Sequence, residues 1–116
     1  MTKVNIARQF SRHPIGRYLD DSDASGQAFR ERFLVPSLKD ANAKLQIELD
    51  GVAGFPSSFL EEAFGGLIRE EGFTGEELRK RLELVHEDES YQTYVEEIWF
   101  YVDEAEREKS DLAVAM

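Results

Sequence analysis

An apolar strand, a glycine turn and an amphipathic helix follow one another in residues 45–68, LQIELDGVAGFPSSFLEEAFGGLI. Leucine and isoleucine alternate with polar residues in LQIEL, which is typical of a strand with one buried face. Asp50-Gly51 ends this strand, and apolar residues recur at helical spacing from Ser57 or Ser58 onward. A strand that leads so directly into a helix favours a fold in which helices pack on a sheet.

The same alternation of strand and helix patterns runs through the whole chain. Further strands are expected at residues 3–7, 15–19 and about 82–86. Further helices are expected at 28–41 after a cap at Ser25, at 76–82 after a capping box of Thr74 and Glu77, and at about 89–109. Because parallel neighbours require a crossover, the pattern predicts an α/β domain with a small mixed, partly parallel four-stranded sheet and helices packed on it. A chain of 116 residues suits one such domain, spanning 1–116.

Proline and glycine indicate where the helices should bend or end. Pro36 lacks an amide proton, so we expect a kink or an early end in the helix over 28–41. Gly72 is expected to stop the helix that begins near Ser57. Gly65 and Gly66 lie inside that helix, at a cost of about 1 kcal/mol each relative to alanine. Such a pair indicates a close approach, either by another element of this chain or by a partner helix.

Charge and composition restrict the classes of function. The net charge of −10 would repel a phosphate backbone, so no nucleic-acid partner is expected. No apolar stretch is long enough for a membrane span or a signal peptide, which predicts a cytoplasmic protein. The absence of cysteine removes disulfides and thiolate zinc sites, and no cofactor is expected.

The serines at the start of the helix have two interpretations. Ser58 and Glu61 have the spacing of a capping box, which would stabilise the helix by about 1 kcal/mol. The same loop and first turn form the surface through which we expect a protein partner to bind, with Phe59 lying off the buried stripe. The expected contact residues are Pro56, Ser57, Ser58, Phe59, Glu61 and Glu62.

The stretch 50–67 resembles the signature of STAS domains, the fold of anti-sigma factor antagonists, in which an apolar strand leads through Asp-Ser-Ser-Gly-Leu into a helix. Ser57, Ser58 and Leu60 occupy matching positions, whereas Pro56 and Phe59 stand where the aspartate and the glycine would be. The aspartate and glycine therefore do not carry over to this chain.

The chain is still more similar to a STAS-like bacterial family of unknown function. The matching stretches are 16–18 (GRY), 25–30 (SGQAFR), 34–38 and 50–67, and the resemblance covers about residues 3–86. In the better understood STAS relatives, a histidine-kinase-like ATPase phosphorylates a serine at this helix start. The resemblance therefore implies a non-catalytic bacterial signalling module, with such an ATPase as its partner and Ser58 as the modified residue.

A helix N-terminus suits this implied chemistry, because its unpaired amides and partial positive charge can hold a phosphate. A phosphate dianion placed at an interface would also reverse the local electrostatics. The alternative is a serine that only caps the helix.

Other constellations suggest different functions. Arg12, Arg17 and Tyr18 lie in one loop and could line a pocket for a phosphate or nucleotide, which would make the protein a small-ligand sensor. A hydrolytic triad could in principle consist of Ser58, Asp50 and His86. The G-x-S-x-G elbow is missing, however, so no catalytic residues are expected. No metal site is expected either, because adjacent residues such as those at 86–89 seldom converge on one ion.

The predicted terminal helix carries more apolar residues than one stripe can bury. Trp99 and Phe100 directly follow Ile98, so one of these rings should be exposed. An exposed aromatic side chain suggests a contact with a partner or a homodimer formed through this helix.

Overall fold

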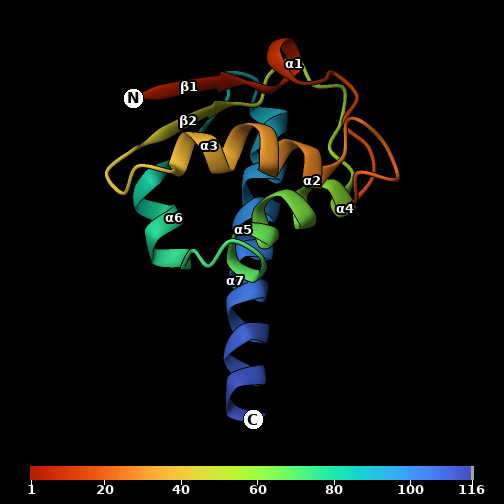
Figure 1. Cartoon of the computed structure of the whole chain (residues 1–116). Coiled ribbons are helices and arrows are strands. Elements are labelled where there is room, and N and C mark those ends of the chain that lie inside the picture. Colours follow the sequence, from red (N-terminus) through yellow and green to blue (C-terminus); the bar gives the residue numbers. More distant parts are fainter. Residues whose placement is uncertain (116) are drawn as a thin grey trace.

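A computed structural model describes residues 1–115 as alternating strands and helices (Figure 1). The strands are β1 (Thr2–Asn5), β2 (Leu45–Glu48) and β3 (Leu82–Val85). The helical segments are α1 (Ile6–Gln9), α2 (Gly26–Phe29), the π turn η1 (Arg30–Leu34), α3 (Val35–Leu38), α4 (Ser57–Leu60), the π turn η2 (Glu61–Gly65), α5 (Gly66–Arg69), α6 (Gly75–Arg81), the 3₁₀ turn η3 (Glu89–Tyr91) and α7 (Gln92–Ala115).

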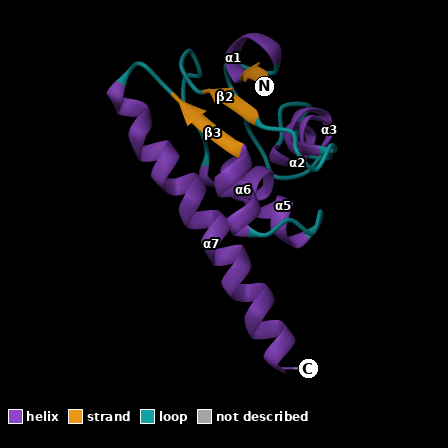
Figure 2. Ribbon diagram, turned by 90° about the vertical axis from the view of Figure 1, so that its left-hand side faces the viewer, coloured by secondary structure: helices purple, strands orange, loops and turns teal. Residues whose placement is uncertain are grey.

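The described residues form a three-stranded parallel sheet in the order β1-β2-β3. Sequential parallel strands joined by right-handed crossovers place their connections on the same face of the sheet. Figures 1 and 2 accordingly show helices α2 to α7 on one side. Val4, Ile47 and Leu84 are register partners that face these helices. The opposite face carries the polar row Lys3, Gln46 and Glu83, and no helix of the described chain covers it.

The expected strand at 15–19 is absent, which leaves three strands among the described residues instead of four. This segment is a loop that bonds to the chain just before α2: the Ile15 amide donates to the Ala24 carbonyl at 2.9 Å, and the Gly26 amide donates to the Gly16 carbonyl at 3.0 Å. Gly16 has a φ of 91° and turns the chain here. These local partners satisfy the backbone groups that a sheet neighbour would otherwise bind.

Residues 57–69 form the central helix, made of α4, η2 and α5. Its Leu60, Phe64, Leu67 and Ile68 are all fully buried, which confirms the stripe expected from their spacing. This helix packs against α2 on one side and α7 on another. Gly72, with a φ of 81°, follows it as the predicted left-handed stop.

The helix that precedes β2 runs from Gly26 to Leu38, so of the kink or early end expected at Pro36, the early end does not occur. Ser25 caps it as predicted, with its Oγ accepting the Ala28 amide at 3.2 Å. The π turn η1 ends at Leu34, two residues before Pro36, and the Val35 amide donates to the Arg30 carbonyl. This change of hydrogen-bond register accommodates the proline, which has no amide to donate. The capping box predicted for Thr74 and Glu77 is also present, at the start of α6.

The last helix, α7, begins at Gln92 and continues to Ala115, beyond the end near 109 that we expected. Figure 1 shows its C-terminal part extending past the other elements. Phe100 is 58% exposed, as predicted for one of the two rings, whereas Trp99 is half-buried beneath the Arg79 guanidinium. Within residues 1–115, no helix is long and apolar enough to cross a membrane.

Candidate functional site

Neighbouring segments hold the loop between β2 and the central helix from several directions. The Asp50 carboxylate accepts the amides of Glu87 and Asp88 at 2.8 and 3.0 Å. The Tyr91 hydroxyl donates to the Val52 carbonyl at 2.6 Å, and the Ala53 amide donates to the Arg12 carbonyl at 2.8 Å. These hydrogen bonds therefore fix the position of the loop that leads into the central helix.

The hydrogen bonds that the backbone amides of Asp88 and Glu87 donate lower the pKa of Asp50, because they stabilise its ionised form. A lowered pKa adds stability above the ordinary aspartate pKa of about 3.9, and this contribution is lost as the pH falls through the lowered value. Asp50→Asn should therefore destabilise the protein at pH 7, and its deficit should shrink as the pH falls below about 4. Urea unfolding of both proteins from pH 7 to pH 3 measures this difference, and a deficit independent of pH would contradict it.

The central helix begins at Ser57, with Pro56 at the N-cap position and no side-chain cap. Pro56 and Ser57 are exposed, and Ser58 is half-buried. The capping box predicted for Ser58 and Glu61 is therefore wrong, because the Glu61 carboxylate binds Arg17 and Arg69 instead. The first turn leaves its amides without a side-chain partner from the serines.

Phe59 and Glu62 are buried, at 0% and 4% exposure, which corrects their expected place on a partner-binding surface. Spacing along the helix indicated one buried stripe, but α2 and α7 cover this helix on different sides. Phe59 lies within 6.2 Å of the Phe10, Phe29 and Phe55 rings, measured between ring centroids. Of the expected surface, Pro56, Ser57 and Ser58 stay accessible, with the half-buried Glu61 beside them.

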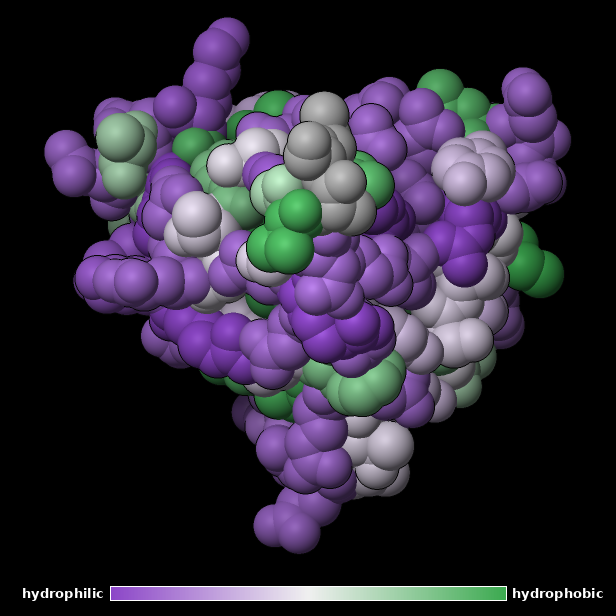
Figure 3. All heavy atoms as spheres, turned by 90° about the horizontal axis from the view of Figure 1, so that it is seen from below, coloured by the Kyte–Doolittle hydropathy of each residue, from purple (hydrophilic) through white to green (hydrophobic). Residues whose placement is uncertain are grey.

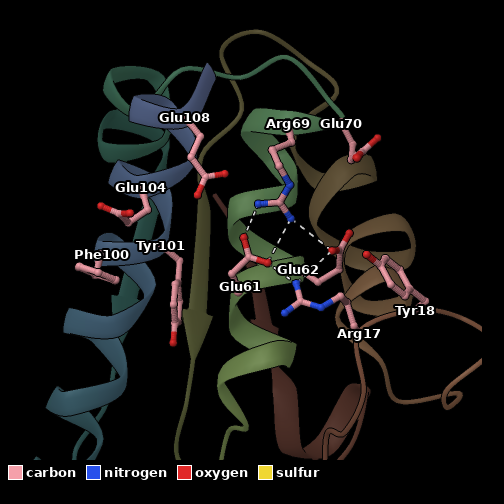
Figure 4. Close-up of a pocket in the computed structure, with 10 residues that line it drawn as sticks. All are labelled: Arg17, Tyr18, Glu61, Glu62, Arg69, Glu70, Phe100, Tyr101, Glu104 and Glu108. Carbon is pink, nitrogen blue, oxygen red and sulfur yellow. Dashed lines mark hydrogen bonds and ion pairs between the residues drawn. The ribbon is translucent and has the colours of Figure 1, made fainter. Parts of the chain in front are cut away.

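Glu61 and Glu62 belong to a network of charges on the central helix (Figure 4). Arg17 and Arg69 both form ion pairs with Glu61. Glu62 is bound by Arg69 at 3.2 Å and by Arg30 at 2.8 Å. Arg30 is itself buried, and its guanidinium also donates to the Glu62 carbonyl at 2.5 Å. Such a buried carboxylate is tolerable only because it is paired and hydrogen-bonded.

Gly65 and Gly66 lie inside the central helix because the absence of a β-carbon leaves space for the side chains of this network. A β-carbon at Gly66 would collide with the Arg30 guanidinium, and one at Gly65 would lie 3.0 Å from Arg69 Nη1. The close approach is therefore made by side chains of this chain. Sequence reasoning missed Arg30 and Arg69, although the glycine pair indicated that something had to come close.

The basic loop residues do not converge on one pocket. Arg17 and Tyr18 line a cavity of 440 Å³ beside α7, together with Glu61, Glu62, Arg69, Glu70, Phe100, Tyr101, Glu104 and Glu108 (Figure 4). Partial burial acts to lower the pKa of Arg17, but the hydrogen bond and charge of Glu61 raise it overall. The Arg17 and Arg69 guanidinium groups are already paired with Glu61, so this cavity does not suit the anion expected there. Arg12 lines a different cavity.

The hydrolytic triad is not assembled. Asp50 is occupied by backbone amides, and the His86 ring contacts the Asp88 carbonyl and Gln92 Oε1, both at 2.9 Å. Neither group is hydrogen-bonded to Ser58 in the part of the chain that the structure describes. Over the same residues, no cluster of metal-ligating side chains is found.

Seen from the end of α7, the molecular surface is mainly hydrophilic, with isolated hydrophobic side chains (Figure 3). This face is typical of a solvated surface, since single exposed apolar residues are common. A homodimer through the C-terminal helix, with Phe100 in the contact, stays a prediction.

A parallel sheet covered by helices on one side, with a serine-bearing helix after its central strand, defines a small α/β module. Residues 25–92 match the family described as a STAS-like domain of unknown function. This match covers more than half of the 116 residues, so the chain belongs to that family, as the resemblance implied. No curated protein and no solved structure is significantly similar to the chain.

Proposed function

We propose that this domain is a non-catalytic bacterial regulatory module that binds a protein partner through Pro56, Ser57 and Ser58. The main support is the uncapped and accessible start of the central helix, which an anchored loop holds in place. A rigid loop lowers the entropic cost of binding, because the contact surface is already ordered. The implied partner is a histidine-kinase-like ATPase, as in the STAS proteins that this chain resembles.

Phosphorylation of Ser58 switches this contact off in the proposed mechanism. The free amides of the first turn can donate hydrogen bonds to phosphate oxygens, and the helix dipole favours the added negative charge. Glu61 lies one turn further along, but Arg17 and Arg69 compensate its charge. The dianion would therefore be tolerated by the fold while it changes the surface that the partner meets.

Affinity capture from the native host tests the proposal. Wild type and Ser58→Ala should capture the same ATPase. Ser58→Glu should bind it at least about tenfold more weakly, a loss of about 1.4 kcal/mol in binding free energy. Ser110→Glu adds the same charge at an exposed serine of α7 and is the matched control. The Ser58→Glu variant must keep the wild-type circular dichroism spectrum. Capture of an ATPase by Ser58→Glu at the wild-type level, or equal loss in Ser110→Glu, would rule out the switch.

A further inference from the structure

A second cavity, of 640 Å³, lies where the three parallel strands end. Asn5, Glu48 and Val85 are the last residues of their strands and are register partners, so their side chains share the uncovered face of the sheet. All three line the cavity. The carboxyl ends of the strands are the edge at which open α/β sheets bind ligands, although the order β1-β2-β3 has no reversal of strand order to form the usual crevice.

The positive charge at this cavity comes from Arg8 and Arg12. Within residues 1–115, neither guanidinium forms an ion pair. The backbone of both residues is fixed, because the Arg8 amide donates to Asn5 Oδ1 at 2.9 Å and the Arg12 carbonyl accepts the Ala53 amide at 2.8 Å. Two guanidinium groups that form no ion pair, on ordered backbone, suit an anionic group such as a phosphate.

The carboxylates of Glu48, Asp50 and Glu87 also line the cavity, and hydrogen bonds to the first two limit the repulsion that they exert on an anion. The two Asp50 oxygens already accept the amides of Glu87 and Asp88. Glu48 Oε2 accepts the Asn5 side-chain amide at 2.9 Å, while its Oε1 has no hydrogen-bond donor among the described residues. A ligand hydroxyl could donate to that oxygen, since an ionised carboxylate only accepts hydrogen bonds.

We propose that this cavity binds a small phosphorylated ligand that carries hydroxyl groups, such as a nucleoside monophosphate or a sugar phosphate. Arg8 and Arg12 bind the phosphate, and Glu48 accepts a hydrogen bond from a hydroxyl group. The volume lies within the range of about 300–1,000 Å³ that is usual for small-molecule sites. The site uses Arg12 of the basic loop but neither Arg17 nor Tyr18, and it does not depend on the serines of the central helix.

Calorimetric titration of the whole chain with AMP tests the site. AMP should bind saturably, and Arg8→Gln combined with Arg12→Gln should weaken binding by at least tenfold. Glu48→Gln should weaken AMP but not inorganic phosphate. Arg107→Gln, which removes one positive charge from an exposed position on α7, should bind like the wild type. Ribose 5-phosphate and adenosine separate the contribution of the phosphate from that of the base.

Several results would overturn the site. No heat with either AMP or ribose 5-phosphate at millimolar concentration would do so, as would equal weakening in Arg107→Gln. If inorganic phosphate bound as tightly as AMP, the ligand hydroxyl groups would contribute nothing, and the proposed hydrogen bond to Glu48 would be wrong. Amide chemical shifts that move near Ser57 instead of at Asn5, Glu48 and His86 would place the ligand elsewhere. Because Ser58→Glu leaves this cavity intact, failure here and failure of the partner proposal are distinguishable.

Discussion

Replacing Arg30 by methionine should lower the free energy of unfolding by about 3 kcal/mol, the lower end of the cost of breaking a buried ion pair. The side chain of Arg30 is only 4% exposed and pairs with Glu62, which is equally inaccessible. Methionine keeps much of the volume but leaves this carboxylate with Arg69 at 3.2 Å and Arg17 at 3.6 Å. These remaining partners are the reason for the lower figure. Urea unfolding followed by circular dichroism measures the change.

A double variant separates the charge effect from packing. Arg30→Met combined with Glu62→Met should recover most of the lost stability, since apolar replacement of a whole buried pair is often neutral. Arg107→Met, in an exposed ion pair of α7, should change stability little. A double variant that is as unstable as the sum of both single variants would show that the two charges do not interact as the structure indicates.

The sequence was sufficient to predict the elements whose signals are local. Alternation of apolar and polar residues marked β2, and Thr74 with Glu77 marked the start of α6, because each pattern depends on neighbours a few residues apart. The prediction of a strand at 15–19 was wrong because the structure of this segment depends on an irregular pairing with another loop. Its backbone bonds to Ala24 and Gly26, and no local pattern of residues indicates such a pairing.

The candidate site was only partly predictable. The turn that carries Ser57 and Ser58 was found, because a strand, a turn and an apolar helix occur there in sequence. The pairing of Glu61 and Glu62 with arginines was missed, since Arg30 lies 32 residues before Glu62 in the chain. Contacts over such separations depend on how α2 packs against the central helix, and spacing within one helix does not encode that packing.

The burial of Phe59 shows the same limit, because a side chain off the main apolar stripe is covered by rings from three other segments. Phe59→Ala should lower the free energy of unfolding by about 3–5 kcal/mol, the usual cost of removing a buried phenylalanine ring. Phe100→Ala, at a ring that is 58% exposed, is the control and should cost much less. Denaturant unfolding of both variants decides the point. If Phe59→Ala were as stable as the wild type but lost the protein partner, Phe59 would belong to the binding surface and not to the core, because only an exposed ring can be removed without leaving a cavity.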